Sequence, residues 1–570
     1  MNTAWLWSSR GAAISVIDSA PRLVPRRVAL PILLALAVGV YFISLGSASI
    51  WDANEAFYVE TPREMLEAHD FINPSFNYLP RFNKPVLSYW IVAAFYKVFG
   101  VSVGVQRFPM ALGALVIIGC AFVLGRIAVD ATRDQGLGID AAFWAATGLA
   151  AAPRLVMFAR RIFIDIWITA FMSLTLMCFA LSERYPARRR AWLVAMYVSI
   201  GLGVLTKGPV AVALPALAFG LYLAITRDLG RIRHMMLPLG AVIIGVIVIP
   251  WYALLYQEHG WTYITSFFIS ENIARYTSGL GVRQQRGVLF YLPVLLSDSF
   301  PVSVFLFAAA AMWIRARPRI QTLLWCWIAA IVAFFSFSAG KQDLYIFPIV
   351  AAVAALGGGA LARGLCDDNW RGWLRWTLAV TGALLAITGA GLLWLFEAGG
   401  RVYALDGARI VGGCGLAGGL VMLVFALARR SVAAALTLLA SLIAIDYAFV
   451  IKVLPDFERY KPVPAIAAML QPRLQPTDVV ANYQVALPSM VYYLQRHVDE
   501  YFEEQPFVSA IRSDRRVYAV LSAEDYTALL PSIGSRTCII ERRQTFDVKL
   551  RSVLSRQPLP ELLVITNSCH

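Results

Sequence analysis

Long stretches with few or no charged residues recur along most of this chain, and they limit its fold more than any other feature. A helix needs about 20 predominantly apolar residues to cross the hydrocarbon core of a bilayer. Runs near this length occupy residues 28–46, 108–125, 138–153, 165–182, 191–206, 208–226, 235–256, 293–314, 320–338, 345–362, 376–396, 410–428 and 431–452. Only 15% of the 570 residues are charged, against about 25% in soluble domains. The sequence therefore predicts a mainly α-helical, polytopic membrane protein with about 13 transmembrane helices.

The net charge of the chain is +15, but the distribution of its basic residues argues against nucleic-acid binding. Lys and Arg are spread over many short loops instead of forming one basic face. Anionic lipid headgroups and phosphates fit this distribution better. The cysteines form no CxxC pair and no cluster with histidines, so no zinc site is expected. Cys538 and Cys569 lie in the C-terminal tail, where a disulfide would require a tail outside the cytoplasm.

The distribution of Lys and Arg between alternate loops predicts the orientation in the membrane. A fourteenth apolar stretch, residues 85–99, is short and contains Lys97. If this stretch is not a span, the cytoplasmic loops after residue 100 hold more basic residues than the outer loops, and counting it as a span reverses the bias. We therefore expect an interfacial helix at residues 85–99, a cytoplasmic N-terminus without a cleavable signal peptide, and a C-terminus outside the cytoplasm.

This orientation divides the chain into a transmembrane domain, residues 1–453, and an outer domain, residues 454–570. Residues 47–106 and 257–292 form two long outer loops, of which the first contains interfacial helices. In the tail the charge rises, and short β-rich runs such as DVVANY and ELLVIT alternate with helical runs such as AEDYTALLPS. This alternation predicts a small α/β domain.

Basic residues on the outer side run against the insertion bias, so they are candidates for a function. Lys207 begins a helix after a very short hairpin, and Lys341 occupies a similar place with Tyr345 one turn further on. A helix N-terminus favours anions, and a lysine strengthens such a site. The other outer candidates are Arg160, Arg161, Asp165 and Arg275. Each basic residue could instead be an anchor that reaches toward the headgroups, but the convergence of several on one face favours phosphate binding.

An acidic segment follows the first predicted span: residues 49–65 read SIWDANEAFYVETPREM. Charge runs of this kind are usually solvated helices at the membrane edge. Beside several cations that bind phosphate, a carboxylate of this segment could instead face a lipid-linked phosphosugar. The residues alone leave both interpretations open.

Six segments together resemble the integral-membrane GT-C glycosyltransferases, and more narrowly the 4-amino-4-deoxy-L-arabinose lipid A transferase family, which is related to protein O-mannosyltransferases. They read SIWDANEAFYVETPREML, RFNKPVLSYW, RFPMALGAL, RRIFIDIWITAFM, LTKGP and GKQDLYIFP. The resemblance implies transfer of aminoarabinose from undecaprenyl phosphate to a lipid A phosphate at the periplasmic face of the bacterial inner membrane, which gives polymyxin resistance. Two positions differ from the family: Asn54 replaces an Asp, and Asn83 replaces a Glu.

The resemblance also implies roles for individual residues. The acids that face the sugar would be Glu55 and Asp165. The substrate-binding residues would be Tyr58, Lys84, Arg161, Lys207, Arg275, Lys341 and Tyr345. Because a phosphate acceptor is already ionised near neutral pH, the site needs to neutralise the departing phosphate more than it needs a general base.

The expected partners are a lipid-linked sugar donor, lipid A and membrane lipids, with no nucleic acid, and the chain is expected to act as a monomer. No cofactor is expected to be required, because no residues have metal-ligand spacing, although a divalent ion that bridges Glu55 and a phosphate would fit the chemistry.

Two other functions stay open. A protein O-mannosyltransferase, or another transferase that uses a polyprenyl-phosphate sugar, would need a base for a hydroxyl acceptor. A transporter or flippase would be expected to have a two-half repeat and a charged pair at mid-span, and the sequence has neither.

Overall fold

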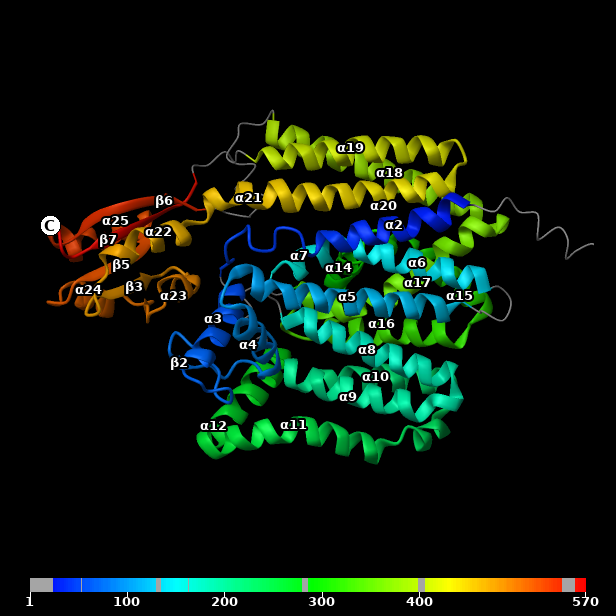
Figure 1. Ribbon diagram of the computed structural model, residues 1–570, viewed down its shortest axis with the longest axis horizontal. Coiled ribbons are helices and arrows are strands. Elements are labelled where there is room, and N and C mark those ends of the chain that lie inside the picture. Colours follow the sequence, from blue (N-terminus) through cyan, green and yellow to red (C-terminus); the bar gives the residue numbers. More distant parts are fainter. Residues whose placement is uncertain are drawn as a thin grey trace, which may run out of the picture.

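The computed structural model describes residues 24–52, 54–129, 135–161, 164–278, 286–397, 405–545 and 559–569. The larger part of the chain is a bundle of long helices aligned with one another, and a smaller unit with a β-sheet lies at one end of this bundle (Figure 1). The N-terminus, whose predicted location is cytoplasmic, and residues 279–285 of the second predicted outer loop lie outside the described residues.

Each predicted apolar run falls on a helix of the bundle. These helices are α2 (Val24–Val40), α5 (Val103–Ala128), α6 (Gln135–Ala150), α7 (Pro153–Ala159), α8 (Ile164–Arg184), α9 (Arg189–Lys207), α10 (Val210–Ile225), α11 (Leu237–His259), α14 (Tyr291–Asp298), α15 (Leu306–Ala316), α16 (Arg319–Ser336), α17 (Val350–Cys366), α18 (Asp368–Glu397), α19 (Asp406–Leu427) and α20 (Ser431–Ala448). Two of the runs form bent helix pairs. The bend between α6 and α7 is 59°, and the bend between the helical segments that contain α14 and α15 is 110°.

Within the described residues, eight helices are long and apolar enough to cross a membrane, or up to ten if each bent pair is one span. The three remaining runs fall on α2, α9 and α10. Helices α2 and α10 have 17 and 16 residues, fewer than any of the eight spanning helices, and α9 begins with Arg189 and Arg190. The prediction of a mainly α-helical, multi-pass membrane protein is confirmed, and the number of 13 spans stays a prediction.

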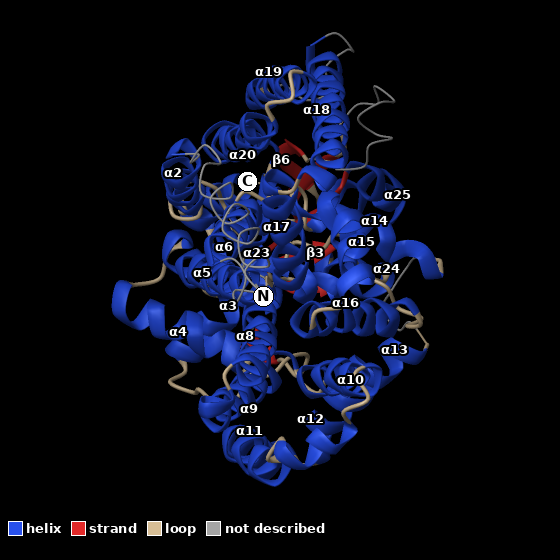
Figure 2. Cartoon of the chain, turned by 90° about the vertical axis from the view of Figure 1, so that its right-hand side faces the viewer, coloured by secondary structure: helices blue, strands red, loops and turns tan. Residues whose placement is uncertain are grey.

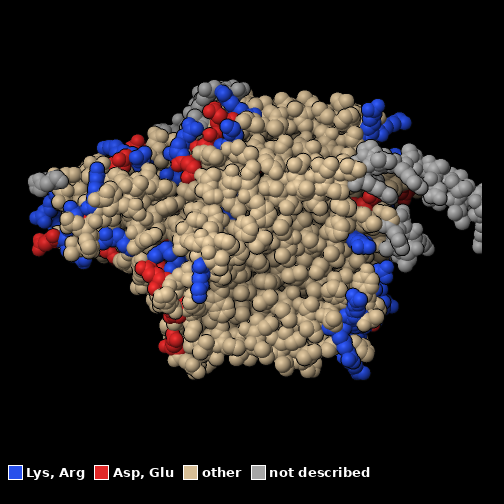
Figure 3. All heavy atoms as spheres, in the orientation of Figure 1, with Lys and Arg blue, Asp and Glu red and all other residues tan. Residues whose placement is uncertain are grey.

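Charged side chains are confined to the two ends of the bundle on the face that Figure 3 shows. The broad middle of this face carries almost none, as expected for a surface in contact with lipid tails. At the end away from the β-sheet, basic atoms predominate, whereas both signs mix at the opposite end (Figure 3). This asymmetry agrees with the predicted orientation, because cytoplasmic ends are enriched in Lys and Arg.

Two helices and a hairpin cover the end of the bundle next to the β-sheet. They are α3 (Asn54–Glu67), β1 (Ser75–Phe76), β2 (Leu79–Pro80) and α4 (Leu87–Phe99). Seen along the bundle, α4 lies across the direction of the long helices (Figure 2). This orientation is the one expected for the interfacial helix predicted at residues 85–99.

A second connection follows α11 and closes the same end. It consists of α12 (Trp261–Ile264), a π-helical segment η3 (Thr265–Ala274) and α13 (Arg275–Thr277). Before α17, a short 3₁₀ helix η6 (Asp343–Ile349) brings the predicted residue Tyr345 to this end.

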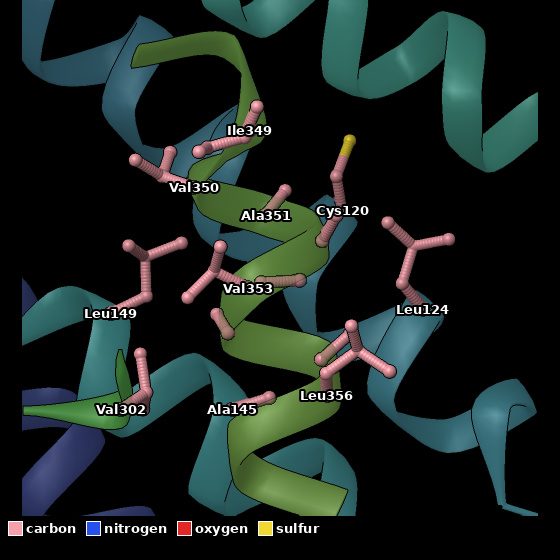
Figure 4. Packing of buried hydrophobic residues seen from close by; sticks show 14 of the residues in the cluster. Cys120, Leu124, Ala145, Leu149, Val302, Ile349, Val350, Ala351, Val353 and Leu356 are labelled. Atoms are coloured by element: carbon pink, nitrogen blue, oxygen red, sulfur yellow. The ribbon is translucent and has the colours of Figure 1, made fainter. Parts of the chain in front are cut away.

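Helix α17 is enclosed by the bundle, and most of its residues are buried. Figure 4 shows it packed against Ala145 of α6 and against Val302. Two glycines permit this approach: a Cβ on Gly357 would lie 2.2 Å from the Val302 carbonyl oxygen, and one on Gly358 would lie 2.4 Å from the Ala145 nitrogen. Small residues allow such contacts between membrane helices, where dispersion rather than hydrophobic burial drives packing.

The tail forms a five-stranded sheet with the order β4-β3-β5-β7-β6. The strands are β3 (Val479–Tyr483), β4 (Asp499–Tyr501), β5 (Val517–Ser522), β6 (Cys538–Gln544) and β7 (Glu561–Thr566). The pairs β3–β4 and β3–β5 are parallel, whereas β5–β7 and β6–β7 are antiparallel. The predicted α/β fold of the tail is confirmed.

Alternate residues of the central strands face opposite sides of the sheet, each covered by helices. Tyr518 and Val520 pack with α22 (Pro462–Leu470) and α23 (Ser489–Leu494), whereas Ala519 and Leu521 pack with α24 (Glu504–Ile511) and α25 (Ala523–Ile533). A disulfide joins Cys538 and Cys569. The helix that contains α20 continues through α21 (Leu454–Phe457) to residue 460, so the predicted domain boundary at residue 454 lies inside a continuous helical segment.

The glycines of α17 provide a test of the packing. We expect Gly358→Ala to lower the thermal stability of the purified protein, because the added Cβ overlaps the backbone of α6, and overpacking typically costs about 1–3 kcal/mol. Gly359→Ala is the matched control, since the nearest atom to its Cβ is Val129 Cγ2 at 3.7 Å. Equal melting temperatures for the two variants would contradict the close contact.

The orientation can be tested with two exposed basic residues, Lys97 and Arg188. In a chain whose exposed Cys366 is replaced by serine, Lys97→Cys should react with a membrane-impermeant maleimide on intact spheroplasts. Arg188→Cys should react only after the membrane is permeabilised, because its loop is predicted to be cytoplasmic. Labelling of residue 188 on intact spheroplasts would be incompatible with the 13-span topology.

Candidate functional site

A cavity of about 500 Å³ lies at the end of the bundle that carries α3 and α4. Its wall is built from separate parts of the chain: α3, the loop before α4, the start of α8, the turn between α9 and α10, the η3–α13 connection, and the segment from the end of α16 to η6. Six of the predicted site residues line it, namely Tyr58, Lys84, Asp165, Lys207, Arg275 and Tyr345. The fold therefore brings together residues that lie far apart in the sequence.

The first charged cluster of the cavity is centred on Glu271. Its carboxylate lies 3.0 Å from Lys84 Nζ and 3.2 Å from Arg275 Nη1. Burial disfavours the charged form of Glu271, but Lys84 and Arg275 outweigh burial and hold its pKa below the ordinary value. Burial lowers the pKa of Lys84, although the contact with Glu271 opposes that change.

The second cluster joins Asp165 and Lys207, which form an ion pair across the start of α8 and the end of α9. Lys207 Nζ also lies 5.6 Å from the centre of the Tyr345 ring. Gly208 ends α9 with a φ of +94°, which a residue with a Cβ rarely adopts, and Pro209 follows it. This sharp turn allows α10 to begin at once and leaves Lys207 at the cavity. Lys207 is therefore the last residue of α9, and its predicted place at the start of the following helix is wrong.

The wall of the cavity also has an apolar part, which is supplied mainly by α8, α10 and α16. Its residues include Ile168, Met172, Val210, Leu214, Phe334 and Phe335. The cavity thus combines three cations and two carboxylates with a surface suited to hydrocarbon. Such a site can hold an amphipathic ligand with a charged head and an apolar tail.

Three glutamates of the acidic segment are buried, and each has a hydrogen-bond partner. Glu55, Glu60 and Glu64 of α3 are each at most 2% exposed. Glu60 accepts a hydrogen bond of 2.6 Å from Arg63, and Glu64 accepts one of the same length from Ser75 Oγ. Burial raises the pKa of Glu64 to about 7. These observations exclude the interpretation of this segment as a solvated helix.

Glu55 does not line the cavity, which differs from the expectation that it faces the sugar. Arg107 donates to both of its carboxylate oxygens, at 2.8 and 3.1 Å. The remaining donors of Arg107 bind the carbonyl oxygens of Leu45, Ala48 and Ser49. The physical reason for the difference is that a buried guanidinium needs a counter-ion, and Glu55 supplies it. Its neighbour Asn54 lines the cavity instead.

Two other predicted substrate-binding residues also lie away from the cavity wall. Arg161 lies 4.2 Å from the centre of the Trp51 ring. Lys341 is buried, and its ammonium group donates to the carbonyl oxygen of Ser338 at 2.6 Å. Arg160 likewise uses its donors on carbonyl oxygens at the end of α2. The chain therefore uses several of its outer cations to satisfy backbone groups.

The tail domain holds the residues that lead into α3. Lys461 Nζ donates to the Ser49 carbonyl oxygen at 2.7 Å and lies 4.1 Å from the centre of the Trp51 ring, which Arg161 also contacts. Asp52 accepts hydrogen bonds from the backbone and side chain of Ser489, at 2.7 and 2.6 Å. The start of α3 is thus fixed by the tail as well as by the bundle.

A further contact ties the tail domain to the β1–β2 hairpin. The side-chain amide of Asn77 donates to the Val498 carbonyl oxygen at 2.8 Å and accepts from the Val498 N–H at 2.9 Å. This pair of bonds imitates the exchange between neighbouring β-strands. The tail therefore contacts the first outer loop on both sides of α3.

The sequence reasoning missed Glu271, which is the centre of the first cluster. Its signal was present, because Glu271 and Arg275 are four residues apart in ISENIARYT and such pairs face each other on a helix. The contact with Lys84, 187 positions away, carries no sequence signal. Asn83 was noted only as a departure from the family, and its side chain donates to Glu271 at 3.3 Å.

Within the described ranges, no three His, Cys, Asp or Glu side chains converge as metal ligands would. The two carboxylates of the cavity are each paired with a cation. In this part of the chain, the charged residues of the cavity therefore form ion pairs between side chains and do not present free carboxylates to a metal ion.

Comparison with known proteins relates the chain to enzymes that use lipid-linked sugars. The family described as Dolichyl-phosphate-mannose-protein mannosyltransferase matches residues 28–264. Undecaprenyl phosphate-alpha-4-amino-4-deoxy-L-arabinose arabinosyl transferase 1 of Pseudomonas fluorescens (strain Pf0-1) is 28% identical over 374 residues, which are 65% of this chain and 64% of that protein. Undecaprenyl phosphate-alpha-4-amino-4-deoxy-L-arabinose arabinosyl transferase of Pseudomonas savastanoi pv. phaseolicola (strain 1448A / Race 6) is 31% identical. The match covers 64% of this chain and 66% of that protein. The matched regions span just under two-thirds of these relatives.

The fold is similar to that of a solved structure over nearly the full chain. The crystal structure of ArnT from Cupriavidus metallidurans bound to undecaprenyl phosphate superimposes with a TM-score of 0.76 and 24% identity, and the match covers 94% of this chain and 98% of that chain. The predicted GT-C fold is confirmed, and so is the resemblance to the aminoarabinose transferases.

The position of Glu55 generates a prediction that separates a structural role from a chemical one. We expect Glu55→Gln to lower the melting temperature, because breaking a buried ion pair leaves Arg107 uncompensated and typically costs about 3–5 kcal/mol. Glu67→Gln is the control, since Glu67 pairs with Arg63 from the same helix but its side chain is 56% exposed. Loss of activity in Glu55→Gln with an unchanged melting temperature would show instead that the carboxylate takes part in the reaction.

Proposed function

We propose that this chain is a polyprenyl-phosphate-sugar-dependent glycosyltransferase. It transfers 4-amino-4-deoxy-L-arabinose from undecaprenyl phosphate to a phosphate of lipid A. The observation that carries the proposal is the cavity itself, where Lys84, Lys207 and Arg275 converge beside an apolar wall. This combination suits a ligand that joins a phosphate to a long hydrocarbon. The names of the relatives, which are transferases of this sugar, support the choice of donor.

In the proposed reaction, an oxygen of the acceptor phosphate attacks the anomeric carbon of the sugar. The bond from that carbon to the oxygen of the lipid phosphate breaks, and its electron pair remains on the lipid phosphate. Lys84 and Arg275 neutralise the charge that develops there, and the Tyr345 hydroxyl donates a hydrogen bond to it. Fixed groups in a partly dehydrated cavity stabilise this charge more effectively than water does. Direct displacement of this kind inverts the anomeric configuration.

Asp165 is the acid assigned to the sugar, because it lines the cavity together with its partner Lys207. Its negative charge stabilises the positive charge that builds on the sugar ring or its amino group. Glu55 acts as a positioning residue, since its contact with Arg107 holds the start of α3 and therefore Asn54 and Tyr58. Lys341 positions the turn before η6 through its bond to the Ser338 carbonyl oxygen. No metal or other cofactor is assigned a step.

We place the cavity on the periplasmic side of the bacterial inner membrane. The excess of basic residues at the opposite end of the bundle supports this orientation, as does the disulfide between Cys538 and Cys569, because disulfides persist in oxidising compartments. The monomer is the proposed active form. Adding an amino sugar to lipid A lowers its negative charge, and resistance to cationic polymyxins is the expected consequence.

Transfer can be measured with the purified chain in nanodiscs, undecaprenyl phosphate-linked aminoarabinose and lipid A, with mass spectrometry of the products. The proposal predicts lipid A that carries the amino sugar on a phosphate. Transfer to a serine or threonine peptide but not to lipid A would favour the O-mannosyltransferase type of function. Movement of the donor across the bilayer without transfer would favour a flippase.

Substitutions in the first cluster should weaken use of the donor. We expect Lys84→Ala and Arg275→Ala each to reduce donor affinity strongly, because losing a partly buried, charge-assisted contact typically costs about 2–5 kcal/mol. Tyr345→Phe should have a milder effect, since it removes one neutral hydroxyl. Lys97→Ala, an exposed lysine of the same outer loop, is the control. If Lys84→Ala binds the donor with an affinity near that of the wild type, Lys84 is an interfacial anchor and does not bind the donor phosphate.

A further inference from the structure

Glu271 occupies the centre of the cationic cluster that the proposed function assigns to the donor phosphate. Its two carboxylate oxygens accept hydrogen bonds from Lys84 Nζ at 3.0 Å and from Asn83 Nδ2 at 3.3 Å, and Arg275 Nη1 lies 3.2 Å from one of them. A carboxylate and a phosphate present similar oxygen acceptors to such donors. Glu271 therefore already holds the groups that a lipid phosphate needs.

The charges of the cluster show why this contact matters. The side chains of Glu271 and Lys84 are 18% and 17% exposed, so both are largely removed from water. The cations lower the pKa of Glu271 in spite of its burial, so the group is a carboxylate at neutral pH. A second anion that entered without displacing it would lie beside a like charge in a region of low dielectric, which is unfavourable.

The backbone on either side of Glu271 is anchored, so its side chain can leave without an opening of the segment. Upstream, the Phe267 ring packs tightly against Gly208. A Cβ on Gly208 would lie 2.6 Å from Cζ of this ring. Downstream, the Tyr276 carbonyl oxygen accepts from the Ala339 N–H at 2.9 Å, and the Tyr276 hydroxyl donates to the Phe334 carbonyl oxygen at 3.0 Å. Rotation about the side-chain bonds of Glu271 is sufficient to exchange its carboxylate for another anion.

We propose that the Glu271 carboxylate occupies the phosphate position of the ligand-free enzyme and competes with lipid phosphate for Lys84, Arg275 and Asn83. The inference rests on the proposed function, because it takes this cluster as the donor-phosphate site. The donor displaces Glu271 when it binds. After transfer, Glu271 returns to the same cations and displaces the undecaprenyl phosphate product. Glu271 thus sets the affinity for lipid phosphate and assists release of the product.

The test measures binding of undecaprenyl phosphate to the full-length chain in nanodiscs for wild type and Glu271→Gln. Glutamine keeps the size of the side chain but competes poorly for the cations. The affinity should therefore rise roughly tenfold, which corresponds to about 1.4 kcal/mol. In turnover, KM for the donor and kcat should both fall, because the product leaves more slowly. Added undecaprenyl phosphate should inhibit Glu271→Gln at lower concentration than wild type.

Glu258→Gln is the matched control, because Glu258 lies near the end of α11, just before the connection that holds Glu271, but accepts a hydrogen bond from Asn73 and does not line the cavity. It removes the same charge and should leave the affinity unchanged. An equal gain in both variants would contradict the proposal, since it would reveal a general electrostatic effect. Unchanged or weaker binding in Glu271→Gln with a wild-type melting temperature would also overturn it.

The same measurements separate this inference from the proposed function. If wild type binds undecaprenyl phosphate and Lys84→Ala weakens that binding, the phosphate site stands whatever Glu271→Gln does. If wild type does not prefer undecaprenyl phosphate over undecaprenol, the proposed function fails. To guard against loss of folding, the double variant Lys84→Ala/Glu271→Gln is included. It should bind more weakly than Glu271→Gln alone, because one of the freed cations is missing.

Discussion

The end of the bundle next to the tail domain depends on a buried arginine. Arg107 of α5 pairs with Glu55 of α3 and also binds three carbonyl oxygens of the segment that leaves α2. A guanidinium removed from water is tolerated only when its donors and its charge are matched. Satisfying Arg107 therefore fixes the path of the chain between α2 and α3, and with it Asn54 and Tyr58 on the cavity wall. The tail domain secures the same segment from the other side through Lys461 and Ser489.

Six cations at this end of the bundle form two groups with different tasks. Arg107, Arg160 and Lys341 direct their donors to backbone oxygens and hold loops in place. Lys84, Lys207 and Arg275 contact carboxylates or an aromatic ring at the cavity, and such partners can be exchanged for a ligand. In the proposed enzyme the cavity cations bind phosphate. The cations that bind backbone oxygens fix the loops and thereby hold the cavity cations in place.

The sequence predicts the architecture well, because apolar runs, charge bias between loops and alternating patterns in the tail are local signals. It also places Asp165 and Lys207 on one side of the membrane through their positions at the ends of predicted helices, whereas Lys84 was implied only by the family resemblance. It could not separate Glu55 from Asp165, because only the fold shows that Arg107, 52 positions from Glu55, is its partner. Glu271 was missed for the same reason, since its contact with Lys84 joins two outer loops that no pattern in the sequence relates.

The central claim is that the cavity between the cations and the apolar wall holds a lipid phosphate. A cryo-electron microscopy map of the full-length chain in nanodiscs with undecaprenyl phosphate tests it most directly. The account predicts density for the phosphate within hydrogen-bond distance of Lys84 and Arg275, with the lipid chain along α8, α10 and α16. Density for the phosphate at any other site, with Glu271 still bound to Lys84, would contradict it.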